Sequence, residues 1–176
     1  MKEKCHVRCY SMKWVVGCLT IYGLLIQSVY AIDHQQVKTA EGDQYDVIAI
    51  SNLKQLRLFL KNSNNQQYYK SFNNIQKNLK QCERLSFAMN AGMFHPGFSP
   101  VGLYVEQAKV IQPLNENKGL GNFFLQPNGV LGWNKKQAFV LTTQQYSRKN
   151  LKVDYATQSG PMLVIDGKIN SLFLSD

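Results

Sequence analysis

Short apolar runs, separated by turns rich in glycine, asparagine and proline, fill the second half of this 176-residue chain. Runs of this length bounded by turn residues predict β-strands instead of helices. A chain with so many short strands buries its apolar side chains by assembling them into a sheet. The predicted strands are residues 85–90, 101–106, 109–114, 122–126, 129–134, 138–143 and 161–166.

Two more strands and one helix are predicted before these runs. The segments "YDVIAIS" (45–51) and "QLRLFLK" (55–61) alternate with a period of two and could pair as a hairpin. Apolar residues then recur at spacings of three and four over 70–82, which predicts a helix, with Ser71 as its cap. One main helix among many strands predicts an α+β fold: a single domain with a mixed, largely antiparallel sheet.

The first 31 residues have the pattern of a secretory signal peptide. A basic opening precedes the thirteen-residue apolar run 14–26, and Val29 and Ala31 occupy the small-residue positions of a cleavage site. An uncleaved membrane anchor is the alternative, but the run is shorter than the roughly 20 residues that a bilayer core requires. We therefore expect an exported protein, periplasmic or extracellular, with no stable membrane span after cleavage. Either Met1 or Met12 could be the start.

The domain that remains after cleavage is expected to comprise a linker over 32–44 and a folded part over 45–176. It keeps 16 Lys and Arg against 10 Asp and Glu, a net charge of +6. The lysines are scattered and no stripe of aromatic residues lines a basic groove, so nucleic-acid binding is not predicted. After cleavage the chain contains one cysteine, Cys82, and two histidines, His34 and His95. A metal site rich in cysteine or histidine is therefore not predicted, and neither is a cofactor. A calcium ion bound by carboxylates remains an open alternative. No oligomeric state is predicted.

Several of the turns carry more polar groups than a strand connection needs. Glycine lets a backbone approach a ligand and expose successive N–H groups, and asparagine and serine add donors. If such turns gather at one edge of the sheet, they form a polar pocket suited to a sugar or a phosphate. The turns in question are "NAGMFHPGFSP", "PLNENKGLGNFF", "QPNGV" and "ATQSGPM".

Four motifs in this order and spacing resemble the phosphodiester glycosidase family: "NAGMF", "SPVGLYVE", "GLGNFFLQPNGV" and "ATQSGPMLVIDGKI". The likeness runs from about residue 45 to 170. It implies an exported hydrolase that cleaves a sugar–phosphodiester bond at the anomeric carbon and releases the sugar. A phosphate oxygen leaves as a stabilised anion, so a strong general acid is less necessary, but water activation still calls for a carboxylate or another base.

The resemblance also implies substrate-binding roles for amide, hydroxyl and glycine residues within the motifs. Structural interpretations stand beside these roles: Asn90 could lock its own turn, Gly92 could serve the backbone alone, and two asparagines flanking an apolar strand could cap its ends. Ser159 beside Gly160 is typical of a ligand contact. The implied binding residues are Asn90, Gly92, Asn122, Asn128, Ser159 and Gly160.

Three residues are candidates for catalysis. Glu116 lies between two asparagines in the glycine-rich loop and is the first candidate for the carboxylate, and Asp154 directly precedes the motif "YATQSG". His95 can titrate near neutral pH and could be a base or a phosphate partner, with an exposed surface histidine as the structural alternative. Glu106 and Asp166 are better explained as a strand-end charge and as the first residue of a tight turn.

A second class of function is a non-catalytic envelope protein that binds a glycan or an anionic polymer. Members of the family normally continue past the hairpin at 166–168 into strands that carry an arginine–asparagine–glycine-type motif, whereas this chain stops at Asp176. We therefore expect a domain that is incomplete at the C-terminus, and an inactive truncated copy is the third possibility. A guanidinium in that motif would be the natural bidentate phosphate clamp.

Overall fold

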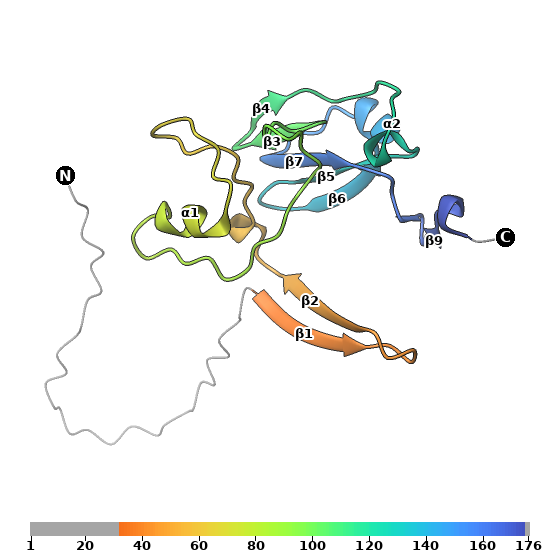
Figure 1. The fold of residues 1–176 in the computed structure, drawn as a ribbon, viewed down its shortest axis with the longest axis horizontal. Coiled ribbons are helices and arrows are strands. Elements are labelled where there is room, and N and C mark those ends of the chain that lie inside the picture. Colours follow the sequence, from red (N-terminus) through yellow and green to blue (C-terminus); the bar gives the residue numbers. More distant parts are fainter. Residues whose placement is uncertain (1–31, 175–176) are drawn as a thin grey trace, which may run out of the picture.

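A five-stranded antiparallel sheet forms the centre of the molecule (Figure 1). The structure is a computed structural model and describes residues 32–174. Within that range every strand pair is antiparallel, which confirms a single, largely antiparallel domain; no parallel pair of the expected mixed sheet occurs there. In spatial order the strands are β4 (Lys109–Gln112), β3 (Tyr104–Glu106), β7 (Tyr155–Ser159), β5 (Gly129–Trp133) and β6 (Ala138–Thr142).

Alternation along the strands gives this sheet two faces with separate apolar cores. On one, which we call the α2 face, Val130 and Ala156 are fully buried beneath Tyr146 of helix α2 (Thr143–Ser147). On the other, the Trp133 face, Trp133 packs with the buried Leu58. The side chains of neighbouring residues in β7 therefore lie on opposite faces of the sheet.

The segment 55–61 covers the Trp133 face without joining a ladder. It follows a short 3₁₀ helix, η1 (Leu53–Gln55), and the indole N–H of Trp133 donates to the Leu56 carbonyl over 3.1 Å. Its predicted period of two is correct, because Leu58 is buried. The predicted hairpin with 45–51 is wrong, because a strand packed face-down on a sheet shows the same alternation as a paired one.

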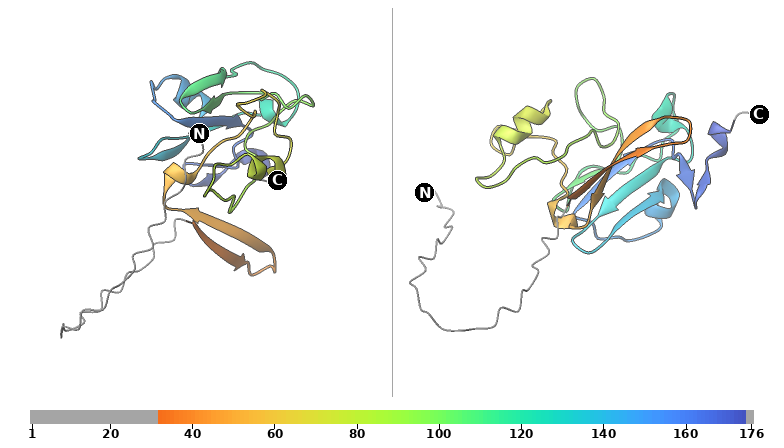
Figure 2. Two further views of the ribbon diagram at one scale, coloured as in Figure 1. Left: turned by 90° about the vertical axis from the view of Figure 1, so that its left-hand side faces the viewer. Right: turned by 90° about the horizontal axis from the view of Figure 1, so that it is seen from below.

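The true partner of β2 (Gln44–Ile50) is β1 (Ile32–Lys38). Residues 32–44, expected as a linker, thus contain a strand and the turn of a two-stranded ribbon. The ribbon projects below the five-stranded sheet in Figure 1 and in the left-hand view of Figure 2. It carries mostly polar residues on β1, which is why its sequence is typical of a linker.

Both helices are short. Helix α1 (Phe72–Lys77) begins as predicted at Ser71, whose hydroxyl accepts from the Asn74 N–H over 3.3 Å. It ends five residues earlier than predicted, and Cys82 has a left-handed backbone that no helix continues through. Helix α2 was not predicted; the capping box formed by Thr142 and Gln145 starts it where a strand end was expected.

Three other segments differ from the sequence prediction. Residues 85–90 are irregular, and the expected strand at 122–126 is the 3₁₀ helix η2 (Asn122–Phe124). The motif "YATQS", expected as a loop, is the central strand β7. The predicted tight turn at Asp166 is confirmed: both it and Gly167 have positive φ, and they join β8 (Val164–Ile165) to β9 (Lys168–Ile169), before η3 (Ser171–Phe173).

The signal-peptide prediction over 1–31 lies outside the described residues. Between residues 32 and 174 none of the helices has the length and apolar character needed to cross a membrane.

Candidate functional site

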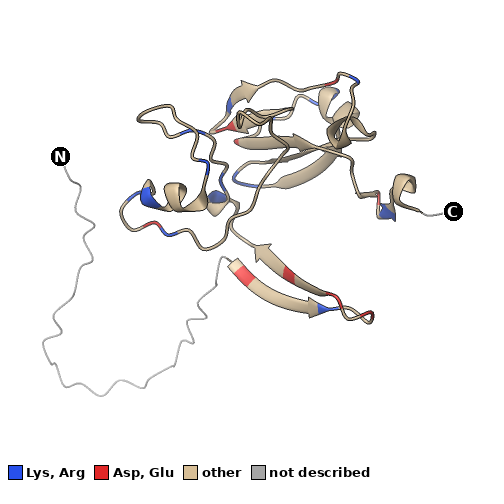
Figure 3. Cartoon of the chain, in the orientation of Figure 1, with Lys and Arg blue, Asp and Glu red and all other residues tan. Residues whose placement is uncertain are grey.

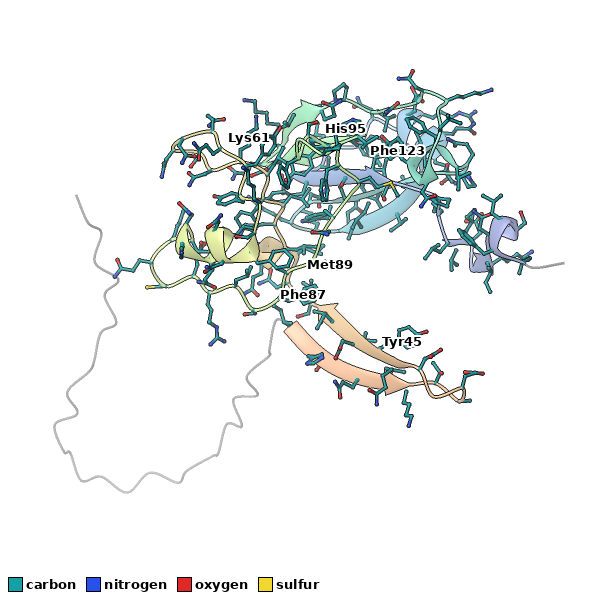
Figure 4. All side chains as sticks on the ribbon, viewed as in Figure 1. Tyr45, Lys61, Phe87, Met89, His95 and Phe123 are labelled. Atoms are coloured by element: carbon teal, nitrogen blue, oxygen red, sulfur yellow. The ribbon has the colours of Figure 1, made fainter. Side chains whose placement is uncertain are left out.

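An open cleft of about 1470 Å³ lies on the Trp133 face of the sheet. Its floor is formed by Trp133 and Leu131 of β5 and by the end of β7. Its walls are formed by α1, the segments 54–60, 68–72 and 82–94, and the ends of β1 and β2. In Figure 4, Phe87 and Met89 lie along the segment that passes between α1 and β2, and their side chains are 40% and 70% exposed. The cleft is therefore lined by loops that have apolar side chains but are largely open to solvent.

Four of the predicted binding residues converge on this cleft: Asn90, Gly92, Ser159 and Gly160. The absence of a side chain at Gly92 allows the turn that carries Asn90 to contact β7, because the Gly92 backbone packs directly against this strand. A Cβ at this position would overlap the hydroxyl of Thr157 and would lie 2.6 Å from the Gln158 carbonyl oxygen. The turn "NAG" is thus held directly on the strand that ends at Ser159.

The turn at 122–128 meets the same end of β7. A Cβ on Gly160 would lie 2.6 Å from Asn128 Cβ and 2.9 Å from the Phe123 carbonyl oxygen. The turns near residues 90, 122 and 159 therefore do gather at one rim of the sheet. Phe123, labelled in Figure 4, is buried beneath this junction.

A buried amide on the α2 face joins these turns from below. Gln158 is 1% exposed, and its Oε1 accepts from the backbone N–H groups of Leu103 and Asn115, each over 3.0 Å. Its Nε2 donates to the Asn115 carbonyl oxygen and to the hydroxyl of Thr143. Thr143 in turn donates to Asn128 Oδ1 over 2.6 Å. Every polar atom of the Gln158 side chain is thus satisfied, as a buried amide requires.

Asn128 belongs to this network instead of the cleft. It is 2% exposed, and its Nδ2 donates to the Phe123 carbonyl oxygen over 3.2 Å. Asn122 is exposed at the first position of η2 and lines no part of the cleft. The structure thus places these two predicted binding residues beside the cleft, where Asn128 fixes the turn that Gly160 touches.

None of the three candidate catalytic residues lines the cleft. Glu116 is exposed and follows Asn115, which is bound to Gln158 on the α2 face, so the sheet lies between Glu116 and the cleft. Asp154 borders a separate, smaller cavity beside the β3–β4 turn. It precedes β7 whereas Ser159 ends it, so the two are roughly 16 Å apart along the strand.

His95 is exposed in the loop beside the cleft. Its backbone N–H donates to the Ser99 carbonyl oxygen, and its own carbonyl accepts from Phe98, so the residue starts a tight turn. Figure 4 labels its position. Its neighbours Phe94 and Phe98 line the cleft, but His95 does not.

Sequence reasoning missed Gln158, Thr143 and the backbone of Asn115. Gln158 lies inside a quoted motif, but the motif was interpreted as a loop, where a glutamine is solvated. The sequence carries no clear signal for this strand, because Tyr155–Ser159 does not alternate between apolar and polar residues.

Comparison with known proteins agrees with this arrangement of motifs. The model of the phosphodiester glycosidase family matches residues 83–175. The chain belongs to this family. The match includes the cleft-lining turns and the whole five-stranded sheet, and it begins later than the expected residue 45, so β1, β2 and α1 lie outside it.

One relative of this chain is the uncharacterized protein YigE of Escherichia coli (strain K12). The two are 33% identical over 87 residues, which are 49% of this chain and 34% of YigE. The chain thus spans about a third of that relative's length. No solved structure matches the chain closely enough for comparison.

Positive charge predominates around the cleft of this family member. The segment 54–84 carries seven Lys and Arg and a single acid, Glu83, while acidic residues gather on the β1–β2 ribbon (Figure 3). Both carboxylates in the lining are already bound. Arg57 contacts Glu83 through two hydrogen bonds of 3.2 Å, and His34 contacts Asp46 at 2.7 Å. The side chains with ionisable charge in the lining are Lys54, Arg57, Lys70, Arg84, Asp46 and Glu83.

These hydrogen bonds keep both carboxylates ionised. The Arg57 guanidinium lowers the pKa of Glu83, and the hydrogen bond from His34 lowers the pKa of Asp46. Lys54, Lys70 and Arg84 form no ion pair within residues 32–174. The lining therefore attracts anions, and a phosphate group is an anion that ammonium, guanidinium and backbone N–H groups bind well. In the described part of the chain no three or more His, Cys, Asp or Glu side chains group as metal ligands would.

Proposed function

We propose that the chain binds a glycosyl phosphodiester in the cleft on the Trp133 face and hydrolyses it at the anomeric carbon. The observation that carries the proposal is the convergence of Asn90, Gly92, Ser159 and Gly160 on one cationic cleft. Membership of the phosphodiester glycosidase family supports the reaction type. The amide and hydroxyl of Asn90 and Ser159 are suited to hold sugar hydroxyls. The lining cations Lys54 and Arg84, which are unpaired within the described residues, are suited to hold the phosphate.

The proposed reaction breaks the bond between the anomeric carbon and the phosphate oxygen. The electron pair of that bond stays on the phosphate, which leaves as a monoester. A water oxygen bonds to the anomeric carbon, and the proton of that water passes to the leaving phosphate. Cationic groups at the cleft stabilise the charge that develops on the leaving phosphate. Because Glu116, Asp154 and His95 do not line the cleft, the proposed site consists of the four turn residues.

The test uses an aryl glycosyl phosphodiester, with free sugar as the readout. The full-length chain is expressed in cells, and the resulting wild-type protein is compared with three variants. Two of them, Asn90→Ala and Ser159→Ala, change the cleft. The matched control is Asn122→Ala, whose side chain is exposed outside the cleft. We expect release of sugar, a loss of about tenfold or more in rate for the first two variants, and no change for the control. Equal activity in all four proteins would reject the site.

A non-catalytic glycan-binding protein is the second candidate. It is favoured by the position of the three expected catalytic side chains outside the cleft. Saturable binding of the same phosphodiester, weakened by Asn90→Ala but with no sugar released over days, would decide for it.

We also propose that the protein is exported, on the basis of the sequence pattern of residues 1–31. Determination of the N-terminal residue of the protein recovered from a cell-envelope fraction tests this. A start near Ile32 in that fraction supports export, and an intact Met1 or Met12 in the cytosol rejects it.

A further inference from the structure

Lys70 and the rings of Tyr68, Phe94 and Phe98 line one side of the cleft, and Lys61 lies beside it, over the Tyr68 ring. The Tyr68 and Phe98 rings have centroids 6.0 Å apart, and Phe94 stacks on Phe98 at 6.0 Å with an interplanar angle of 17°. The ammonium of Lys61 lies 4.6 Å from the centre of the Tyr68 ring, and that of Lys70 lies 5.6 Å from the centre of the Phe98 ring. We call these five residues the aromatic–lysine wall.

The ring contacts hold the two ammonium groups without neutralising them. Cation–π attraction orients an ammonium but leaves its full charge. No carboxylate lies within ion-pair distance of Lys61 or Lys70 in the described residues. Both lysines are exposed, so the wall presents two unpaired positive charges at fixed places beside apolar ring surface.

The backbone that carries the wall is held in an uncommon conformation. Lys70 and Phe98, which contact each other, have φ values of 60° and 67°. A left-handed backbone is costly for a bulky residue and persists only where neighbouring contacts impose it. Bridges from Lys61 to Tyr68 and from Phe94 to Pro100 tie both loops at their bases. The wall is therefore a constrained surface in which two loops are locked together.

The wall and the four turn residues share one cleft. Tyr68, Lys70, Phe94 and Phe98 line it together with Asn90 and Ser159. Its volume of about 1470 Å³ exceeds the roughly 300–1,000 Å³ of a pocket for one small ligand. A single sugar phosphodiester at the turns would leave the wall free, so the cleft has room for more than one unit of a longer ligand.

We propose that the aromatic–lysine wall binds a neighbouring sugar–phosphate unit of a polymeric substrate, a glycan whose units are joined or decorated by phosphodiesters. The half-exposed ring of Phe94 packs against the C–H face of the sugar, and Lys61 and Lys70 bind the adjacent phosphate. The inference rests on the proposed function, because it assigns to the same cleft a preference for polymers over single phosphodiesters.

The test measures binding of a phosphomannan to the full chain by calorimetry, with unphosphorylated mannan and inorganic polyphosphate as separate probes. We expect phosphomannan to bind more tightly than either, and added salt to weaken it. The double variant Lys61→Met, Lys70→Met keeps the aliphatic stems and should bind phosphomannan about tenfold more weakly. The matched control Lys109→Met, Lys168→Met removes the same charge from exposed lysines outside the cleft and should bind as the wild type does.

A second variant tests the ring separately from the charge. Phe94→Ala should weaken phosphomannan binding severalfold while binding of polyphosphate stays unchanged. Equal losses in the lysine double variant and its control, or no binding of phosphomannan at all, would overturn the wall as a binding surface. Tighter binding of polyphosphate than of phosphomannan would also overturn it, since the sugar would then contribute nothing.

The two experiments distinguish failure of the turn site from failure of the aromatic–lysine wall. If the aryl glycosyl phosphodiester is neither bound nor cleaved but phosphomannan still binds through Lys61 and Lys70, the wall stands and the turn site is rejected. If the small phosphodiester is cleaved equally by wild type and the lysine double variant while phosphomannan binding is also equal, the turn site stands and the wall is rejected.

Discussion

Replacement of Gly92 by alanine tests the contact on which the cleft depends. The added Cβ would lie 2.6 Å from the carbonyl oxygen of Gln158, about 0.8 Å inside an ordinary carbon–oxygen contact of roughly 3.4 Å. The carbonyl belongs to β7, which β3 and β5 hold on both sides, so the turn at Asn90 must retreat instead. Overpacking of this kind costs about 1–3 kcal/mol, which lowers the melting temperature of a chain this size by roughly 2–12 °C.

The same retreat should reduce activity more than it reduces stability. A displacement near 1 Å can cost up to about a hundredfold in rate when it separates groups that bind one substrate. Melting followed by circular dichroism, together with sugar release well below the melting temperature, measures both effects. A further Thr157→Ala change should restore little, because it removes the side-chain overlap but leaves the carbonyl.

Gly97→Ala is the matched control for this prediction. Gly97 lies in the same loop as Gly92, but a Cβ there would meet nothing within 4 Å. We expect its melting temperature to equal that of the wild type or to rise slightly, since alanine restricts the unfolded chain. If Gly92→Ala melts and reacts as Gly97→Ala does, the close approach of the turn to β7 is refuted, and with it the proposed site.

Three further predictions concern the sheet and its charges. Gln158→Leu leaves the buried groups it had bound without partners and should destabilise the fold by about 3 kcal/mol or more, measured by urea unfolding. Burial raises the pKa of Glu106, so its ionisation opposes folding as pH rises above the ordinary glutamate range. The variant Glu106→Gln can still accept the hydrogen bond from the Tyr104 hydroxyl. Its free energy of unfolding should exceed that of the wild type at pH 7 and not at pH 4. Arg57 lowers the pKa of Glu83, so the stability that this pair provides is present at neutral pH and lost as pH falls below about 4.5. In Glu83→Gln the free energy of unfolding should therefore fall less steeply with pH in the acid range. An unchanged slope would contradict this.

Much of the sheet could be predicted from the sequence, because β5 and β6 are short apolar runs bounded by turn residues, and β6 exposes and shields alternate residues over most of its length. The predictions failed where the same pattern has two structural explanations. Residues 55–61 alternate because they cover the Trp133 face, and 122–126 is apolar because Phe123 fills the junction beneath the turns. Strand β7 was missed because its buried face is made of Ala156 and Gln158, and a buried glutamine is recognisable only when its four partners are known.

The convergence of the motif turns could be predicted from the sequence, whereas the positions of Glu116, Asp154 and His95 outside the cleft could not. Motif glycines marked where backbones approach, and Gly92 and Gly160 do mediate the approach. Proximity in sequence does not bring a candidate to the cleft when a strand lies between: Asp154 precedes β7 and Ser159 ends it. The contribution of Lys61 and Lys70 could not be predicted, because it depends on two loops far apart in sequence that meet through Tyr68 and Phe98.

The consecutive positions of Gln158 and Ser159 on opposite sides of β7 have a consequence for genetics. A mutation screen scored by enzyme turnover would select both positions, although only the Ser159 side chain is on the cleft side of the strand. Loss of the Gln158 amide would release Leu103, Asn115 and Thr143 at once and imitate the loss of a reacting group. A measurement that does not depend on turnover would distinguish the two residues. Hydrogen exchange of the Leu103 and Asn115 amides should become faster when Gln158 is replaced and should not change when Ser159 is replaced.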